Sequence, residues 1–223
     1  MLNELDKELE ARGLNFVRYA DDCNIFVGSR KAAERVMKSI TDFIERKLGL
    51  KVNATKSQIG RPDGIKFLGF GYFADKDGKY QPKPHELSIE KLKRKLKVLT
   101  SRKWSISLDE RLRKIRQQIS GWANYFRIAE MRASLVAIDK RLRMRVRVVI
   151  WKQWKVPKKR YESLRKLGVA HSYAHNAAYS GKGYQAVCKT HTIHAALTNK
   201  LLEQRGLISL SSLYAKIHLV ATC

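Results

Sequence analysis

The chain has 223 residues, 44% of them hydrophobic, and a formal net charge of +26 at pH 7. That share of apolar residues is enough for a packed core, so the composition excludes a disordered basic tail. No run of about eighteen apolar residues occurs, so we expect no membrane span, and three scattered cysteines, Cys23, Cys188 and Cys223, are typical of reduced thiols rather than of a disulfide framework.

The basic charge is concentrated in one part of the chain. Residues 1–80 contain 15 lysines and arginines against 12 acidic residues, whereas residues 88–166 contain 25 against 6. A folded segment this basic repels itself unless a polyanion neutralises it, and binding to nucleic acid would release counterions. We therefore expect nucleic acid as the partner. An anionic membrane surface and a ribosome-like assembly are the alternatives.

The first eighty residues alternate between helical and strand patterns. Leucines at helical spacing predict a first helix that Gly13 ends, and Ser29 predicts the N-cap of a second helix that runs to Leu48 and stops at Gly49. Between these helices, two apolar runs flank the tetrapeptide Tyr19-Ala20-Asp21-Asp22 and predict a hairpin. Further short strands are expected over residues 50–53, 57–60, 65–73 and 79–82, with Asp77-Gly78 as a hairpin turn.

The acidic pair at the hairpin tip can be interpreted in two ways. Two neighbouring carboxylates repel each other, and a solvated turn is the plain interpretation. The pair becomes favourable when a divalent cation lies between the carboxylates, and oxygen ligands suit Mg²⁺. Carboxylates that hold paired metals are the core of polymerase-type phosphoryl transfer.

After a linker at Pro82-Lys83-Pro84-His85 the pattern becomes helical. One apolar stripe covers residues 89–99, a capping box at Ser107-Leu108-Asp109-Glu110 opens the next helix, and a long helix is expected over 132–155. Pro157 is expected to close this bundle. Short helices are then predicted near 160–167, 169–179 and 191–204, followed by a strand or short helix over 209–219.

Candidate nucleic-acid contacts gather on and after the long helix. Four arginines alternate with apolar residues there, so they spread around the helix axis and only some can face a partner. Two tryptophans precede a basic run, and interleaved rings and cations are what stacking on unpaired bases needs, with core packing as the alternative. The candidate residues are Arg141, Arg143, Arg145, Arg147, Trp151, Trp154, Lys158, Lys159 and Arg160.

Tyr19-Ala20-Asp21-Asp22 after a strand resembles the catalytic signature of reverse transcriptases. Three later segments resemble further motifs of those proteins in the same order. Residues 48–56 and 65–70 are similar to palm motifs, and residues 119–126 are similar to the thumb, or maturase, domain of group II intron-encoded proteins. The resemblance covers nearly the whole chain.

This resemblance implies an α+β fold with a partial reverse-transcriptase palm over 1–82 and a basic helical thumb/maturase domain over 86–223. It implies RNA-directed DNA polymerisation, intron RNA binding and assistance to splicing. Asp21 would bind Mg²⁺, Asp22 would support the hairpin or touch a second metal, and Lys56 would neutralise a phosphate at the catalytic site. Adjacent strand residues point to opposite faces, so the two carboxylates are not expected to hold one ion equally.

In the family, a third aspartate on an earlier palm strand completes the metal site, and this sequence has no room for it. We therefore expect the chain to be the carboxyl-terminal half of such a protein, from a truncated gene, a split gene or a shortened chain. Alternatives are an inactive RNA-binding remnant, or one half of a split reverse transcriptase. The expected partners are group II intron RNA, an RNA template with a DNA primer, and a chain that supplies the missing fingers and palm, in a bacterial-type cytoplasmic ribonucleoprotein.

Overall fold

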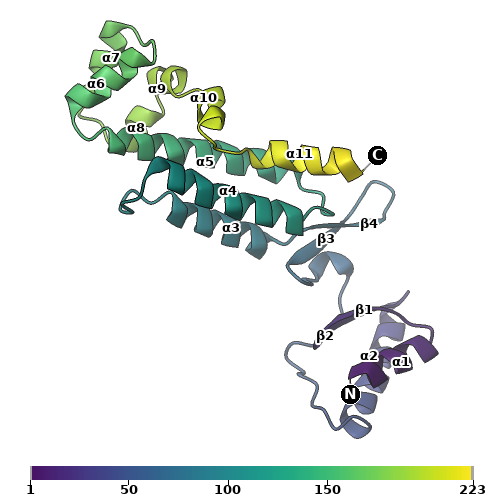
Figure 1. Cartoon of the computed structure of the whole chain (residues 1–223). Coiled ribbons are helices and arrows are strands. Elements are labelled where there is room, and N and C mark those ends of the chain that lie inside the picture. The colour runs from purple at the N-terminus through teal and green to yellow at the C-terminus, as the bar shows by residue number, and fades with distance from the viewer. Residues whose placement is uncertain (1, 222–223) are drawn as a thin grey trace. The chain divides into compact units, whose positions relative to one another are not determined.

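The computed structural model describes residues 2–221, with side chains described throughout except at 132–133 and 218–221. Two compact units divide the chain between Gln81 and Pro82, and we refer to them as unit 1 and unit 2. Unit 1 mixes helices with hairpins and unit 2 is almost entirely helical, so the protein has an α+β fold (Figure 1). Among the described residues, none of the helices combines the length and the hydropathy that a membrane crossing requires. Cys223 lies outside them, and Cys23 and Cys188 are free thiols.

Unit 1 is built around a small core between two helices and a hairpin. These elements are α1 (Leu2–Ala11), β1 (Asn15–Tyr19), β2 (Asp22–Phe26) and α2 (Arg30–Arg46). Leu5 and Leu9 of α1 and Ile40 of α2 are buried, and Phe16 and Ile25 of the hairpin pack against them. Phe16 and Ile25 are paired across the two strands, so both project from the same face of the sheet.

The helix ends of unit 1 lie where short-range signals predict them. The Ser29 hydroxyl accepts a hydrogen bond from the amide of Ala32 at 3.2 Å, which caps α2. Gly13 and Gly49 follow the two helices with φ values of +63° and +66°, a conformation that glycine adopts without a steric penalty. The predicted second helix is therefore present, although it ends at Arg46 rather than Leu48.

The strands predicted over 50–53 and 57–60 do not form. Asn53 folds this segment into a turn instead, because its side-chain oxygen accepts from the amides of Thr55 and Lys56 while its carbonyl accepts from Lys56 and Ser57. Such local bonds satisfy backbone groups that a sheet would otherwise use. A short 3₁₀ helix, η1 (Pro62–Gly64), follows.

The strand predicted over 65–73 begins only at Phe70. Leu68 and Gly69 both have positive φ, and Phe67 and Phe70 exchange two backbone hydrogen bonds across them. This tight turn interrupts the apolar run, and β3 (Phe70–Ala74) then pairs with β4 (Tyr80–Pro84). The predicted turn at Asp77-Gly78 is present, with Gly78 at φ +75° and the Asp75 carboxylate accepting from the amides of Asp77 and Lys79.

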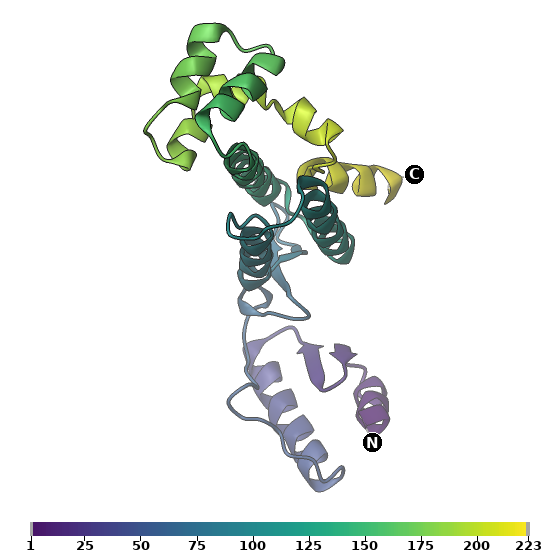
Figure 2. The same ribbon diagram turned by 60° about the vertical axis from the view of Figure 1, so that its left-hand side comes forward.

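Unit 2 is a helical bundle with a group of short helices beyond it. Its long helices are α3 (Glu86–Leu99), α4 (Leu108–Tyr125) and α5 (Arg132–Gln153), which Figure 2 shows nearly end-on. Helix α4 packs against α3 and against α11 (Leu210–Ala221), and α5 packs against α8 (Tyr184–Cys188) and α11. Their facing side chains are fully or almost fully buried, including Leu92, Leu96, Leu112, Ile115, Ile119, Leu135, Leu142, Val146 and Ile150.

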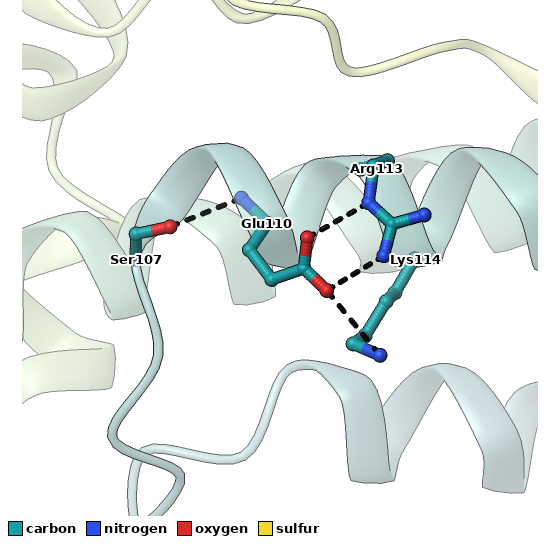
Figure 3. Close-up of polar contacts among 4 residues, drawn as sticks. All are labelled: Ser107, Glu110, Arg113 and Lys114. Atoms are coloured by element: carbon teal, nitrogen blue, oxygen red, sulfur yellow. Dashed lines mark hydrogen bonds and ion pairs between the residues drawn. The ribbon is translucent and has the colours of Figure 1, made fainter.

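The start of α4 combines a cap with an ion-pair cluster. The Ser107 hydroxyl accepts from the Glu110 amide at 3.2 Å, as a capping box requires. The Glu110 carboxylate does not turn back toward Ser107; it receives Arg113 Nε and Nη2 at 2.7 and 2.8 Å and Lys114 Nζ at 3.3 Å (Figure 3). These contacts lower the pKa of Glu110 from 4.5 to about 2, with the Arg113 hydrogen bonds as the largest cause.

Pro157 starts a helix instead of closing the bundle. It is the first residue of α6 (Pro157–Lys166), where a missing backbone N–H costs nothing. Beyond it lie α7 (His171–Ala178) and then α8. The helix predicted over 191–204 is broken into α9 (His191–Ala196) and α10 (Asn199–Gln204), because the Thr198 hydroxyl caps a new helix. The last segment, left open between strand and helix, is the helix α11.

A buried carboxylate fixes α11 to the bundle. Asp139 of α5 is 2% exposed and accepts from the amides of Leu210 and Ser211 at 2.8 and 3.0 Å and from the hydroxyls of Ser209 and Ser211 at 2.7 and 2.6 Å. The side chain of one helix therefore satisfies the free amides at the start of another. The negative charge also lies at the positive end of the α11 dipole.

Candidate nucleic-acid interface

The acidic pair lies at the tip of the β1–β2 hairpin, as the sequence predicts. Tyr19 and Asp22 form the last cross-strand pair, so Ala20 and Asp21 make a two-residue turn and Asp22 opens β2. Both carboxylates are exposed. Ala20 has φ +54°, a left-handed conformation that costs an alanine about 1–2 kcal/mol. Such strain is retained where the surroundings enforce it.

Arg18 holds this turn in place through hydrogen bonds to the turn and to α1. Its Nη1 donates to the Ala20 carbonyl at 2.8 Å, while its Nε donates to Asp6 of α1 at 2.6 Å and its Nη2 makes a second bond to the same carboxylate. These hydrogen bonds lower the pKa of Asp6 and raise that of Arg18. The guanidinium therefore ties the carbonyl of the strained residue to α1 and positions Asp21 and Asp22. We did not predict this pair, because its members are 12 residues apart.

The two carboxylates have the oxygen ligands that a divalent cation requires, but two side chains are too few for a polymerase-type metal site. Carboxylate oxygens are ligands that Mg²⁺ accepts, yet a polymerase site needs more than two neighbouring side chains to hold its metals in position. Among residues 2–221, no three histidine, cysteine, aspartate or glutamate side chains come together as a metal site would require. The donor set for a polymerase-type metal site is therefore incomplete within the described residues.

Lys56, predicted to meet a phosphate, lies in the turn that Asn53 organises. Its amide donates to both the side-chain oxygen and the carbonyl of Asn53, at 3.2 and 3.1 Å, and the residue is exposed. The backbone at this position is thus fixed while the ammonium group stays in solvent. The role of Lys56 remains a prediction.

The four arginines of α5 have different environments. Arg147 is 4% exposed; its Nε donates to the Leu197 carbonyl at 2.9 Å and its Nη2 to Asn199 Oδ1 at 3.0 Å. Arg145 is half-buried and donates to Thr100 Oγ1 at 2.6 Å and to the Lys97 carbonyl at 2.9 Å. Burial lowers the pKa of both. Arg143 is partly exposed and Arg141 is exposed.

Arg147 therefore does not belong to a nucleic-acid surface in this structure, and Arg145 is largely used within the fold. Each guanidinium holds carbonyl or side-chain oxygens where a helix ends, Arg145 at the end of α3 and Arg147 between α9 and α10. Positive charge is favourable at such ends, because free carbonyls gather there. Of the four candidates, Arg141 is the one whose charge is fully available to a partner.

The two tryptophans also differ. Trp151 is 1% exposed, so it cannot stack on a base, and its assignment to the RNA-binding surface is wrong for this structure. Trp154 is partly exposed and meets the Trp151 ring edge-to-face at 5.7 Å. The Arg160 guanidinium joins these rings in a cluster, since it lies 5.1 Å from the Trp151 ring centroid and 5.3 Å from that of Tyr184.

Two further residues join this cluster without having been predicted. The guanidinium of Arg102, in the α3–α4 loop, lies 5.4 Å from the Tyr184 ring centroid, so one ring serves two arginines. Arg102 and Tyr184 come from segments far from Arg160 in the chain, which is why sequence spacing does not reveal them. Cation–π contact orients both guanidinium groups but does not neutralise their charge.

Lys158 and Lys159 occupy the first turn of α6 beside this cluster. Both are exposed, and neither takes part in an ion pair within the part of the chain that the structure describes. Together with Arg102 and Arg160 they form what we call the basic surface. Cations at the amino-terminal end of a helix oppose its dipole, so they are not placed there for the stability of α6. The arrangement suits an external polyanion.

Comparison with known proteins agrees with both units. Residues 1–72 match the reverse transcriptase (RNA-dependent DNA polymerase) family, and residues 89–168 match the group II intron maturase-specific domain. The chain is also similar to the COX1/OXI3 intron 2 protein of Saccharomyces cerevisiae, with 40% identity over 57 residues. That stretch is 25% of this chain and 7% of the yeast protein. The reverse transcriptase family uses divalent metal ions generally, and the maturase domain implies binding to intron RNA. The chain therefore contains a segment that matches reverse transcriptases, followed by one that matches the maturase-specific domain of group II introns.

Proposed function

We propose that unit 2 binds group II intron RNA through the basic surface and assists the splicing of that RNA. The observation that carries the proposal is the unpaired charge at the start of α6, where Lys158 and Lys159 stand exposed beside Arg160. Phosphate contacts by such cations release counterions and supply affinity without reading sequence. The shape of the folded RNA would then provide the selectivity.

Charge-reversal variants can separate the contribution of the basic surface to RNA affinity from that of the net charge of the whole chain. The double variant K158E/K159E should lower the affinity for a structured group II intron RNA by about tenfold or more at low salt, since two phosphate contacts are lost. The control K31E/K38E makes the same change in net charge on exposed residues of α2 in unit 1. This control variant should bind the intron RNA with an affinity within about threefold of that of the wild-type chain. Equal losses in the two variants would contradict the proposal.

Assistance to splicing is tested on the same variants. The wild-type chain should speed excision of the intron from a precursor RNA at a Mg²⁺ concentration where the RNA alone splices slowly, and K158E/K159E should lose that effect. Tight binding without any change in the excision rate would leave an RNA-binding protein and would contradict the splicing part of the proposal.

For unit 1 we propose a place in a polymerase site that other groups complete. Asp21, and with it Asp22, would bind Mg²⁺ beside at least one carboxylate from a separate polypeptide, on an RNA template with a DNA primer. The match of residues 1–72 to reverse transcriptases supports this proposal. The chain by itself should therefore extend no primer on an RNA template. Extension by the chain alone that disappears in Asp21→Ala would overturn it.

A further inference from the structure

A row of four rings runs along α6 and α7, outside the basic surface. Tyr161 of α6 shares a hydrogen bond of 2.8 Å with His171 Nδ1, and the two rings meet edge-to-face at 5.6 Å. His171 is followed by His175 at 6.1 Å, and His175 stacks on Tyr179 at 4.6 Å with an interplanar angle of 26°. The three residues of the 171–179 segment are spaced four apart, so they share one helix face. We call this row the ring ladder.

The ring ladder contributes little to the core. His171 and His175 are exposed and Tyr179 is 54% exposed, whereas Ala174 and Ala178, in the neighbouring row of the same helix, are buried. Helix α7 thus packs through its alanines and leaves its rings in solvent. Tyr161 is partly buried and its hydrogen bond to His171 joins α6 to α7, but the three rings of the 171–179 segment leave most of their area in solvent.

The segment that carries the ring ladder is basic. Beyond Lys158, Lys159 and Arg160 of the basic surface, residues 157–183 contain three further cations, Arg165, Lys166 and Lys182, and a single acidic residue, Glu162. Helix α7 carries no aspartate or glutamate at all. Aligned aromatic faces bordered by cations match the chemistry of a nucleic-acid strand, whose bases stack while its phosphates need positive charge.

We propose that the ring ladder is a stacking platform for unpaired bases of an RNA strand. This inference rests on the proposed function, because it names a second contact of the same RNA partner. An exposed ring offers its π-face to any base, so binding is tolerant of sequence and requires a single-stranded segment. Paired bases already stack on their neighbours and cannot use the platform. The outer end of the stack, Tyr179, is expected to contribute most.

The test uses the full chain and a short single-stranded RNA that carries one 2-aminopurine base, whose fluorescence falls when it stacks on a ring. Tyr179→Ala and His175→Ala should each weaken binding by about 5- to 150-fold, the equivalent of about 1–3 kcal/mol per stacked base. Both should also remove the quenching. Tyr179→Phe keeps the ring, so it should retain the binding affinity and the fluorescence quenching of the wild-type chain. Tyr173→Ala is the matched control, because Tyr173 is 65% exposed on the same helix and lies off the ladder.

Duplex RNA of the same length should bind all of these variants equally. Circular dichroism confirms that each variant is folded before its affinity is interpreted. If Tyr179→Ala binds the single strand as tightly as Tyr173→Ala while intron RNA binding by the wild type persists, the platform is refuted and the proposed function stands. If the wild-type chain binds neither RNA, the proposed function fails and this inference fails with it.

Discussion

At the scale of single residues, cations of unit 2 serve opposite purposes. Arg147 is buried and bonded to Leu197 and Asn199, whereas Arg141, on the same helix, is exposed. Arg111 is likewise buried and donates to the carbonyls of Leu99, Ser101 and Trp104 between α3 and α4. The net charge of the chain therefore overstates the charge available to a partner, because part of it holds helix ends and loops together.

The pair Arg147 and Arg141 gives a test of this division. Arg147→Ala should lower the free energy of unfolding by about 2–3 kcal/mol, because it leaves the buried Leu197 carbonyl without its donor and removes the hydrogen bond to Asn199. Arg141→Ala should leave stability within about 0.5 kcal/mol, as is usual for an exposed side chain, and should weaken RNA binding. Urea unfolding and RNA titration of both variants would check this. The assignment is wrong if the two variants cannot be told apart in stability.

At the scale of elements, the sequence predicts helix ends better than strands. Ser29, Ser107 and Thr198 act on amides no more than three residues away, and Gly13 and Gly49 act on their own backbone, so these signals can be recognised in a short window. Thr198 nevertheless was missed as a cap within one long predicted helix. The start of the strand expected over 65–73 was predicted too early. Leu68 adopts a left-handed conformation, and leucine is not a residue type from which that conformation would be predicted.

Long-range contacts explain what the sequence could not show at the candidate site. The hairpin tip with Asp21 and Asp22 was predicted, because its strands and turn are adjacent in the chain. The partners of Arg147 are 50 and 52 residues away, and the helix that carries Trp151 packs against α8 and α11, both of which lie more than 30 residues further along the chain. The ring ladder could have been recognised from the four-residue spacing of His171, His175 and Tyr179.

The start of α4 predicts a pH dependence of stability. Glu110 has an ordinary pKa of 4.5 and a folded-state pKa of about 2, so its carboxylate stabilises the folded chain fully above about pH 4.5. That contribution is lost as the pH falls from about 4.5 toward 2. The difference in melting temperature between wild type and Glu110→Gln should therefore shrink over this range. Thermal melts from pH 7 to pH 2 would measure it.

The partners of Glu110 provide the control for this prediction. Arg113→Gln removes the largest cause of the lowered pKa. In the Arg113→Gln background, the effect of Glu110→Gln should be smaller, and high salt should reduce it further. An effect of Glu110→Gln that is the same at pH 2 and pH 7 would contradict the assignment.

At the scale of the whole molecule, the two units differ in the size of the buried apolar core that stabilises them. The core cluster of unit 1 has three buried residues, Leu5, Leu9 and Ile40, beside the β1–β2 hairpin, and Val17 and Tyr19 on the outer face of that hairpin are 48% and 64% exposed. An isolated two-stranded sheet is marginal in water. Unit 2 has the larger buried core, spread over several helices.

Limited proteolysis should therefore release a resistant fragment that begins near Pro82. Backbone amides of β1 and β2 should exchange with deuterium faster than those of α4 and α5, because local opening is easiest where few apolar contacts are buried. Mass spectrometry can follow both. If residues 2–81 outlast residues 82–221 under protease, the account of the two units is wrong.

The central claim is that the basic helical residues 88–166 bind intron RNA. A salt titration of RNA affinity tests this claim most directly. Fluorescence anisotropy would compare a structured group II intron RNA with a scrambled RNA of equal length between 50 and 200 mM salt. If roughly 6–10 cations meet phosphates, the affinity should fall by about 10³–10⁵ over that range on duplex-like scaling. The intron RNA should also remain the tighter ligand at physiological salt. An affinity that does not depend on salt, or equal affinity for the two RNAs, would contradict the claim.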